Sequence, residues 1–261
     1  MPLLARTGSG FRADQNLFRS TSAEHLFRRT STLPPKPSGL VAVLIEPGPN
    51  VTETELTDWY EGEHVPRRLT VPGFLSALWY RAIDSQSPSW LTLYDIETPE
   101  AANSSAYVAL ADLASDNEKG ILSKIALSRR TYSSIRTFTP PSTSEADLPS
   151  RYILVVSFIM KSPEGEAELD KWYNGEHFEM LAKVPGYQQG ARFLLLSHKE
   201  RGDLIGKKVH KFFAFHSFSN KDFLGTPEFK AATSTEWRER VMAQCENREA
   251  RVFELYKNLG A

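Results

Sequence analysis

The chain has 261 residues and a formal net charge of -1, so no strong overall charge favours nucleic acid or a membrane surface as a partner. Hydrophobic residues make up 41% and charged residues 24%, which is ordinary for a globular protein, and no apolar run is long enough to cross a bilayer. The one cysteine, Cys245, excludes a disulfide framework within the chain and fits a reducing compartment such as the cytoplasm.

Residues 1–38 differ in composition from the rest. They are rich in Ser, Arg and Pro, with six basic residues against only Asp14 and Glu24. An Arg- and Ser-rich, acid-poor start is typical of an organelle transit peptide, so a mitochondrial location is the alternative to the cytoplasm. We favour the simpler interpretation, a basic N-terminal extension.

The next segment, residues 39–140, predicts one α+β unit. A capping-box pattern at Thr52 and Glu55 starts its first helix. That helix carries the hexapeptide WYEGEH at residues 59–64 and ends at the breaker VPG, residues 71–73. Apolar and β-branched runs predict strands. We expect strands at residues 40–46, 74–83, 90–96 and 132–139, and a second helix at residues 99–114.

A linker at residues 141–150 leads to a second unit, residues 151–257. Ser162 and Pro163 give a helix cap followed by a proline in the first turn. This helix carries WYNGEH at residues 172–177 and ends at a second VPG. We expect strands at residues 152–160, 187–197, 209–218 and 250–256, and a second helix at residues 227–245.

The two units are copies of one another. Residues 58–74 align without a gap on residues 171–187, at a constant offset of 113, and eight of the seventeen positions are identical. Each unit has the order β-α-β-β-α-β of a ferredoxin-like fold. A lone sheet with helices on one face leaves its other face bare, and two units can bury those faces together. We therefore predict an α+β protein in which two tandem ferredoxin-like units form an intramolecular α+β barrel. It would be a monomer built as a pseudo-dimer, and a further homodimer is left open.

A helix with W-Y-x-x-E-H, followed by V-P-G-F/Y and a strand, resembles the dimeric α+β barrel superfamily and, within it, the EthD-like proteins. It occurs here as WYEGEHVPRRLTVPGF and WYNGEHFEMLAKVPGY, and the resemblance covers about residues 39–257. The resemblance implies a cavity between sheet and helices, often lined by a helix histidine. It does not select a reaction, because the superfamily includes monooxygenases, polyketide cyclases, isomerases, dehydratase- and decarboxylase-like enzymes, and heme proteins.

The hexapeptides supply the candidate catalytic residues. On a helix, positions i and i+4 share a face, so each motif places tyrosine near histidine and tryptophan near glutamate. Histidine titrates near neutral pH and suits proton transfer, tyrosine could orient a substrate oxygen, and glutamate could assist. The alternative is that these histidines are buried and only structural. The candidates are His64, His177, Tyr60, Tyr173, Glu63 and Glu176.

Residues on the strands complete the candidate substrate site. Matching the third strands by pattern puts Asp95 opposite His216, which predicts a His64–Asp95 pair in the first unit and a His177–His216 pair in the second. Matching the second strands puts Trp79 opposite Arg192. The candidate substrate-binding residues are Trp59, Trp172, Trp79, Tyr94, Asp95, Arg192 and His216, although packing in the core is the commoner role for such aromatics.

The sequence contains no G-x-G-x-x-G, P-loop, HExxH or CxxC motif, and we predict no metal site. The leading hypothesis is an enzyme of polyketide, aromatic or other secondary or catabolic metabolism that uses acid–base catalysis without a cofactor. Its reaction would be of the isomerase or lyase type, such as cyclisation, dehydration or decarboxylation. Two alternatives are a heme-binding barrel protein and a non-catalytic ligand-binding or interaction protein.

Overall fold

The computed structural model describes residues 36–260. All but the last three residues of the predicted N-terminal extension, residues 1–38, lie outside this range. Among the described residues, no helix combines the length and the apolar character needed to span a bilayer.

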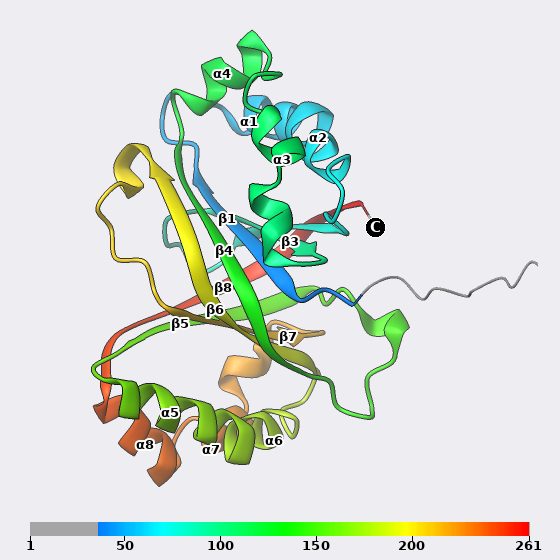
Figure 1. The fold of residues 1–261 in the computed structure, drawn as a ribbon. Coiled ribbons are helices and arrows are strands. Elements are labelled where there is room, and N and C mark those ends of the chain that lie inside the picture. The colour runs from blue at the N-terminus through cyan, green and yellow to red at the C-terminus, as the bar shows by residue number, and fades with distance from the viewer. Residues whose placement is uncertain (1–35, 261) are drawn as a thin grey trace, which may run out of the picture. The chain divides into compact units, whose positions relative to one another are not determined.

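Eight antiparallel strands close into a barrel in the order β1-β3-β2-β8-β5-β7-β6-β4 (Figure 1). The four strands of each repeat are adjacent in this order, and β2–β8 and β4–β6 pairs join the two repeats. Closure removes the free sheet edges that each repeat would expose alone. The prediction of two ferredoxin-like units in one intramolecular barrel is confirmed. The strands are β1 Gly39–Glu46, β2 Ala77–Ala82, β3 Trp90–Ile96, β4 Ala126–Phe138, β5 Tyr152–Met160, β6 Tyr187–Arg201, β7 Phe212–Phe218 and β8 Cys245–Gly260.

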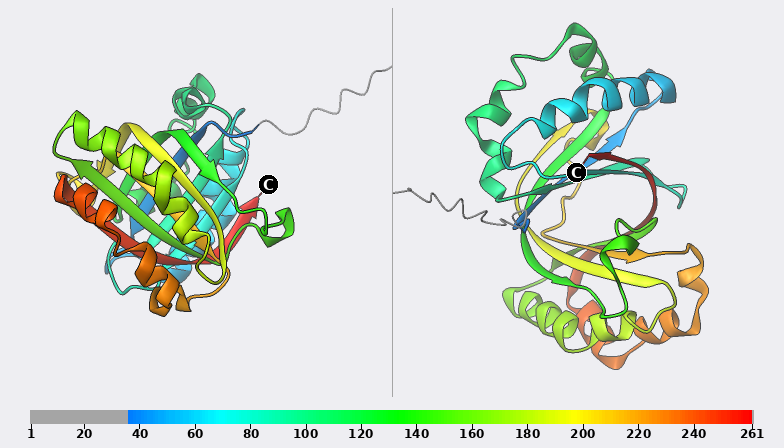
Figure 2. Two further views of the ribbon diagram at one scale, coloured as in Figure 1. Left: turned by 90° about the horizontal axis from the view of Figure 1, so that it is seen from below. Right: turned by 90° about the vertical axis from the view of Figure 1, so that its right-hand side faces the viewer.

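Helices cover the outside of the barrel on two opposite sides, one side for each repeat (Figure 2). The side chains form three apolar clusters: one between the first repeat's sheet and helices, one between the second's, and one inside the barrel. Strands β1, β3 and β5 therefore bury both faces, which explains their nearly continuous apolar sequences. The helices are α1 Glu53–Trp59, α2 Val65–Leu69, α3 Ser105–Ala109, α4 Asp116–Leu122, α5 Pro163–Trp172, α6 Phe178–Leu181, α7 Pro227–Ala232 and α8 Glu236–Ala243.

The hexapeptides form π-helical turns, at Tyr60–His64 between α1 and α2 and at Tyr173–His177 between α5 and α6. In each, the N–H of the following residue donates to the carbonyl five positions back, from Val65 to Tyr60 and from Phe178 to Tyr173. Such turns widen the helix locally and are frequent at functional sites. The sequence predicted an unbroken helix here, so the π turns are a correction.

The second helical segment of each repeat is also more broken than predicted. The helix expected at residues 99–114 is a 3-10 turn at Pro99–Asn103 followed by α3, and α4 lies further on, in a stretch without a predicted element. The helix expected at residues 227–245 is split into α7 and α8. Strand β6 runs to Arg201 and so is longer than expected: it has 15 residues, whereas its counterpart β2 has six.

Candidate functional site

The first repeat contains an open cavity of about 560 Å³ between its helices and the outer face of the barrel. Pockets of this size hold ligands of drug size. Its wall is apolar at Val41, Val43, Phe74 and Leu110, and it includes His64, Arg68, Tyr94, Tyr107 and Glu118. The cavity therefore places the histidine of the first hexapeptide in contact with space for a small molecule.

The equivalent place in the second repeat is almost filled. A cavity of only about 30 Å³ is left beside His177 and His216. Phe229 from α7 and Met242 from α8 line this remnant, and Trp237 lies so close to Gly175 that a Cβ there would be 2.9 Å from its ring. The two hexapeptides thus face different surroundings, and only the first adjoins a cavity large enough for a substrate.

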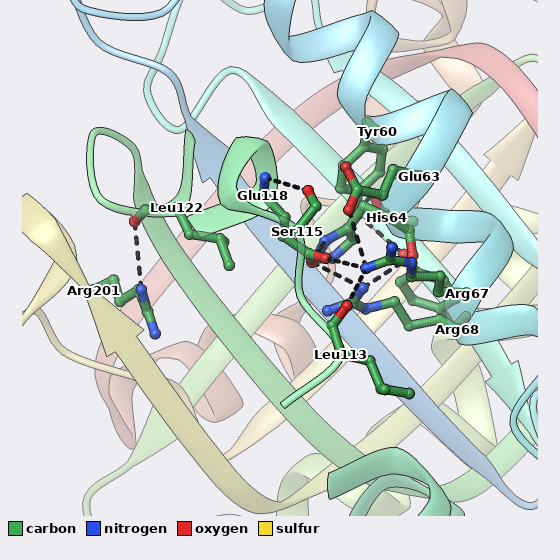
Figure 3. Close-up of polar contacts among 12 residues, drawn as sticks. Tyr60, Glu63, His64, Arg67, Arg68, Leu113, Ser115, Glu118, Leu122 and Arg201 are labelled. Atoms are coloured by element: carbon green, nitrogen blue, oxygen red, sulfur yellow. Dashed lines mark hydrogen bonds and ion pairs between the residues drawn. The ribbon is translucent and has the colours of Figure 1, made fainter. Parts of the chain in front are cut away.

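His64 is fixed by a carboxylate that the sequence did not single out. Its Nδ1 lies 2.8 Å from Oε1 of Glu118, which is on α4 and 1% exposed (Figure 3). Ser115 caps α4 by accepting a hydrogen bond from the backbone N–H of Glu118, which holds this residue at the third position of the helix. The ring of His64 stacks on Tyr60 with centroids 5.0 Å apart, and Trp59 contacts it edge-on.

Two arginines one turn after His64 complete the carboxylate's environment (Figure 3). Arg68 donates to Oε1 of Glu118 at 3.1 Å and Arg67 donates to Oε2 at 3.2 Å. Burial alone would raise the pKa of Glu118, but its hydrogen bond with His64 and the charge of Arg68 lower the pKa to about 2. For His64, burial acts in the other direction and lowers the pKa to about 4. The hydrogen bond with Glu118 offsets only part of this effect.

These pKa values define the state of the pair near neutral pH. Glu118 is ionised and His64 is neutral. The neutral imidazole then carries its proton on Nδ1 and donates it to Glu118, since an ionised carboxylate only accepts. Nε2 keeps its lone pair and has no hydrogen-bond partner within residues 36–260. A nitrogen in this state can accept a proton from a ligand or coordinate a metal ion.

At the position that corresponds to Glu118, the second repeat has a basic residue in place of the acidic one. Arg238 occupies the third position of α8, where its N–H donates to the cap residue Thr235, as that of Glu118 does to Ser115. No carboxylate therefore holds His177 within the described residues, and Nδ1 of His177 is buried without a partner. Burial, and then the charges near it, lower the pKa of His177 well below its usual value.

Tyr60 uses its hydroxyl within the protein rather than in the cavity. The hydroxyl lies 2.7 Å from Oγ1 of Thr92 and 3.3 Å from the hydroxyl of Tyr94. Tyr94 lines the cavity, so it is the tyrosine placed to contact a ligand. Replacing Tyr60 by phenylalanine is expected to lower the free energy of unfolding by about 1 kcal/mol, because it leaves Thr92 unpaired. Denaturant titration measures this.

Tyr173 provides the matched control for that substitution. It occupies the equivalent position, but its hydroxyl has no hydrogen bond within residues 36–260, and the register places Ala214 where the first repeat has Thr92. Tyr173→Phe is therefore expected to cost less than Tyr60→Phe. Equal costs for the two variants would contradict the role assigned to Thr92.

The predicted His64–Asp95 pair is wrong, because Asp95 faces the inside of the barrel. Strand register pairs Val41 with Tyr94 and Leu154 with His216, so the counterpart of His216 is Tyr94. Asp95 instead accepts a hydrogen bond from Ser76 at 2.9 Å and lines a separate cavity of about 450 Å³ within the barrel. Burial raises its pKa.

The structure does bring His177 and His216 together, with ring centroids 5.7 Å apart. Both are buried, and neither nitrogen of His216 has a hydrogen-bond partner in the described part of the chain. Burial lowers the pKa of His216 to about 3. A buried neutral pair of this kind fills space and resists protonation, which fits a structural role better than proton transfer.

Acid is expected to destabilise the protein through these histidines. The folded pKa values of His64 and His216, about 4 and about 3, lie below the ordinary 6.5, so the unfolded chain binds more protons as pH falls below 6.5. Each pKa unit corresponds to about 1.4 kcal/mol, so unfolding free energy should fall by several kcal/mol between about pH 6.5 and pH 4. Denaturant titrations across this range measure it, and His216→Leu should flatten the slope. A flat profile in the unsubstituted protein would contradict the buried neutral state.

The remaining predicted residues lie mostly in the core or in ion pairs. Trp59 and Trp79 are buried and do not line the first cavity, and Trp172 lines the small second one.

The predicted polar residues are held by other side chains. Glu63 pairs with Arg67, and Glu176 accepts hydrogen bonds from Trp172 and Thr235. The predicted correspondence of Trp79 with Arg192 agrees with the strand register; Arg192 is 2% exposed and donates to Asp170 at 2.6 Å.

No protein-family model matches the chain, and no curated protein matches its sequence. The fold, however, is similar to solved structures. One is an anthrone oxidase-like protein, with 14% identity, 87% of this chain and 95% of that chain covered, and a TM-score of 0.58. Another is a chlorite dismutase variant from Candidatus Nitrospira defluvii, with 8% identity, coverage of 85% and 92%, and a TM-score of 0.54. A heme-degrading enzyme from Listeria monocytogenes has 8% identity, coverage of 83% and 99%, and a TM-score of 0.41.

At these identities the likeness shows the fold alone, an α+β protein with a closed barrel. The narrower EthD-like resemblance gains no family match. The expectation of a protein without a cofactor is contradicted, because a chlorite dismutase shares this fold. We withdraw that expectation.

Proposed function

We propose that the protein is an enzyme that acts on a small, flat aromatic compound in the first cavity, and that Nε2 of His64 accepts a proton from it. One observation carries this proposal: a neutral histidine, oriented by a buried carboxylate, lines the cavity of about 560 Å³. The second repeat supports it by contrast, since His177 has neither the carboxylate nor the space.

The residues around His64 suit a proton transfer. A ligand hydroxyl or an acidic C–H would give its proton to Nε2 and leave an anion, while Glu118 stabilises the imidazolium that forms. Arg67 and Arg68 hold Glu118 ionised and in place. The hydroxyl of Tyr94 can orient an oxygen of the ligand, and the aromatic rings of Phe74 and Tyr107, which stack on each other 5.4 Å apart, offer a flat wall.

Anthrone is a suitable first compound for testing this reaction. It is flat and aromatic, and its methylene group between two rings loses a proton readily. The resulting anion can be oxidised by dissolved dioxygen, which gives anthraquinone and water. The name of the anthrone oxidase-like structure makes oxidation a better first test than the isomerase or lyase chemistry expected from the sequence, which begins with the same proton transfer.

Blocking the cavity tests its use. Ala111 lines the cavity and is exposed, so tryptophan at this position would fill the cavity without disturbing the core. Ala109 is exposed nearby on α3 but does not line it, and Ala109→Trp is the matched control. We expect Ala111→Trp to abolish anthrone consumption, followed by absorbance, and Ala109→Trp to retain it. Turnover that survives Ala111→Trp would place the reaction elsewhere.

The same geometry favours heme binding as a second candidate function. Ligating histidines commonly donate their other ring N–H to a carboxylate, as His64 does to Glu118. The cavity has an apolar wall at Val41, Val43 and Phe74 and carries basic residues that could pair with heme propionates, so the residues fit the group. Nε2 of His64 would hold the heme iron, and bound heme would supply redox chemistry.

Heme titration separates the two candidates. A Soret band that saturates at one heme per chain, and that shifts in His64→Asn but not in His177→Asn, would support the second. Absence of any heme-induced spectral change at stoichiometric concentration would remove heme binding and leave the proton-transfer proposal in place.

A further inference from the structure

Basic residues surround the first cavity in excess over acidic ones. Its lining includes five cations and one carboxylate, and that carboxylate, Glu118, is already bound by His64 and two arginines. An anionic group on a ligand would be attracted to such a site. The five cations are Arg68, Lys119, Arg129, Lys199 and Arg201.

Two of these cations come from the other repeat. Lys199 and Arg201 lie at the C-terminal end of β6. Their cross-strand partners on β4 are Arg129 and Leu127, respectively. Strand β6 reaches this far because it is nine residues longer than its counterpart β2, 15 against six. The second repeat therefore extends β6 alongside β4 of the first repeat and supplies part of the wall of the first repeat's cavity.

These cations are available to a ligand. Within the described residues, no carboxylate lies within 4.0 Å of Lys199, Arg201 or Arg129. One guanidinium nitrogen of Arg129 donates to the carbonyl of Ala102 at 2.5 Å, and its Nε is buried without a hydrogen-bond partner. Arg201 reaches only a backbone carbonyl, that of Leu122 at 3.5 Å (Figure 3). Arg129 lies 4.6 Å over the ring of Tyr107, so the basic group and the aromatic wall adjoin.

Figure 3 also shows where the basic group lies relative to His64. Arg201 is well separated from the cluster of His64, Arg68 and Glu118. Apolar side chains of Leu122 and Leu127 line the cavity on the side of Arg201. A ligand that spans the cavity would thus contact Nε2 of His64 at one end and the cations Lys199 and Arg201 at the other.

We propose that the first cavity takes a planar aromatic compound that bears a carboxylate, and that Lys199 and Arg201 of the second repeat bind this carboxylate. The proposal rests on the function proposed above and narrows its substrate class. It also assigns the second repeat a part in the site, although its own cavity is closed. Arginine binds a carboxylate with two parallel hydrogen bonds, and lysine adds a point charge.

Isothermal titration with a matched pair of probes tests this. The probes are anthraquinone-2-carboxylate and its methyl ester, which differ in charge but share the flat ring system. We expect the unsubstituted protein to bind the acid more tightly than the ester. The double variant Lys199→Met, Arg201→Met should weaken binding of the acid by about 10- to 100-fold and leave the ester unchanged. Added salt should weaken acid binding.

A second double variant controls for overall charge. Lys183→Met, Lys230→Met removes the same two charges from the exposed surface of the second repeat, at positions that line neither repeat's cavity. It should bind the acid as the unsubstituted protein does. Equal weakening by both double variants, or equal affinity for acid and ester in the unsubstituted protein, would overturn the proposal.

The failures of the two proposals are distinguishable. If acid and ester bind equally and Ala111→Trp blocks both, the proposed function survives and the carboxylate site is overturned. If neither probe binds, protoporphyrin IX and heme are titrated in the same way, and binding that weakens only in Lys199→Met, Arg201→Met supports the proposal with a porphyrin as the source of the carboxylate. If none of these compounds binds, both proposals are overturned.

Discussion

Replacing His64 by asparagine is expected to lower kcat/KM for anthrone by about 10²- to 10⁴-fold, the usual contribution of a general base. The reason is local: His64 is the histidine that lines the open cavity and is oriented by Glu118. The rate should be measured with protein whose far-UV circular dichroism and melting temperature show that it is folded.

His177→Asn is the matched control, because it changes the same position of the other hexapeptide. His177 lines a cavity of only about 30 Å³, so its loss is expected to leave turnover within a few-fold of the unsubstituted protein. A large loss of turnover in His177→Asn with little loss in His64→Asn would reverse the assignment of the working repeat. Equal, small effects in both would remove histidine from the reaction.

Replacing Glu118 by alanine is expected to lower the free energy of unfolding by about 3–5 kcal/mol, since removing one partner of a buried charge cluster leaves the others uncompensated. Glu118 is 1% exposed and bound by His64, Arg67 and Arg68. Urea denaturation measures the loss. The variant should also lose turnover, because the imidazole would no longer be held in one orientation.

Glu63→Ala serves as the control for this substitution. Glu63 forms an ion pair with the same Arg67, but its side chain is partly exposed and the pair is one helical turn apart in sequence. Pairs of this kind contribute less than about 1 kcal/mol. A cost for Glu118→Ala no larger than that for Glu63→Ala would show that the cluster does not stabilise the fold.

The repeat made the fold predictable. A constant offset of 113 residues, two matched hexapeptides and two matched strand orders were enough to specify two units and their closure into one barrel. The helix caps at Thr52 and Ser162 were also predictable, because capping depends on residues that are adjacent in sequence.

The site was only half predictable, because its second half is distant in sequence. His64 was recognisable from the hexapeptide, but Glu118 lies 54 positions further on, in a stretch between two predicted elements. The best signal for it was Ser115-x-x-Glu118, a capping-box pattern at the start of α4. Asp95 was misplaced because alignment by pattern shifted the third strand by one residue, which moves a side chain to the other face of the sheet.

The difference between the two cavities could not be read from the matched motifs at all. It arises from residues outside the aligned segments 58–74 and 171–187. Side chains of α7 and α8 fill the second cavity, and the extended end of β6 forms part of the wall of the first. The sequence has a polar, glycine-containing turn at residues 199–208, longer than its counterpart in the first repeat, but its length did not reveal that part of it continues the strand as far as Arg201.

A crystal structure with anthraquinone-2-carboxylate would show directly whether the first repeat binds the substrate and the second repeat supplies its anion site. We predict the ring system in the first cavity, with one edge at Nε2 of His64 and the carboxylate at Lys199 and Arg201. The compound bound beside His177, or inside the barrel beside Asp95, would contradict it.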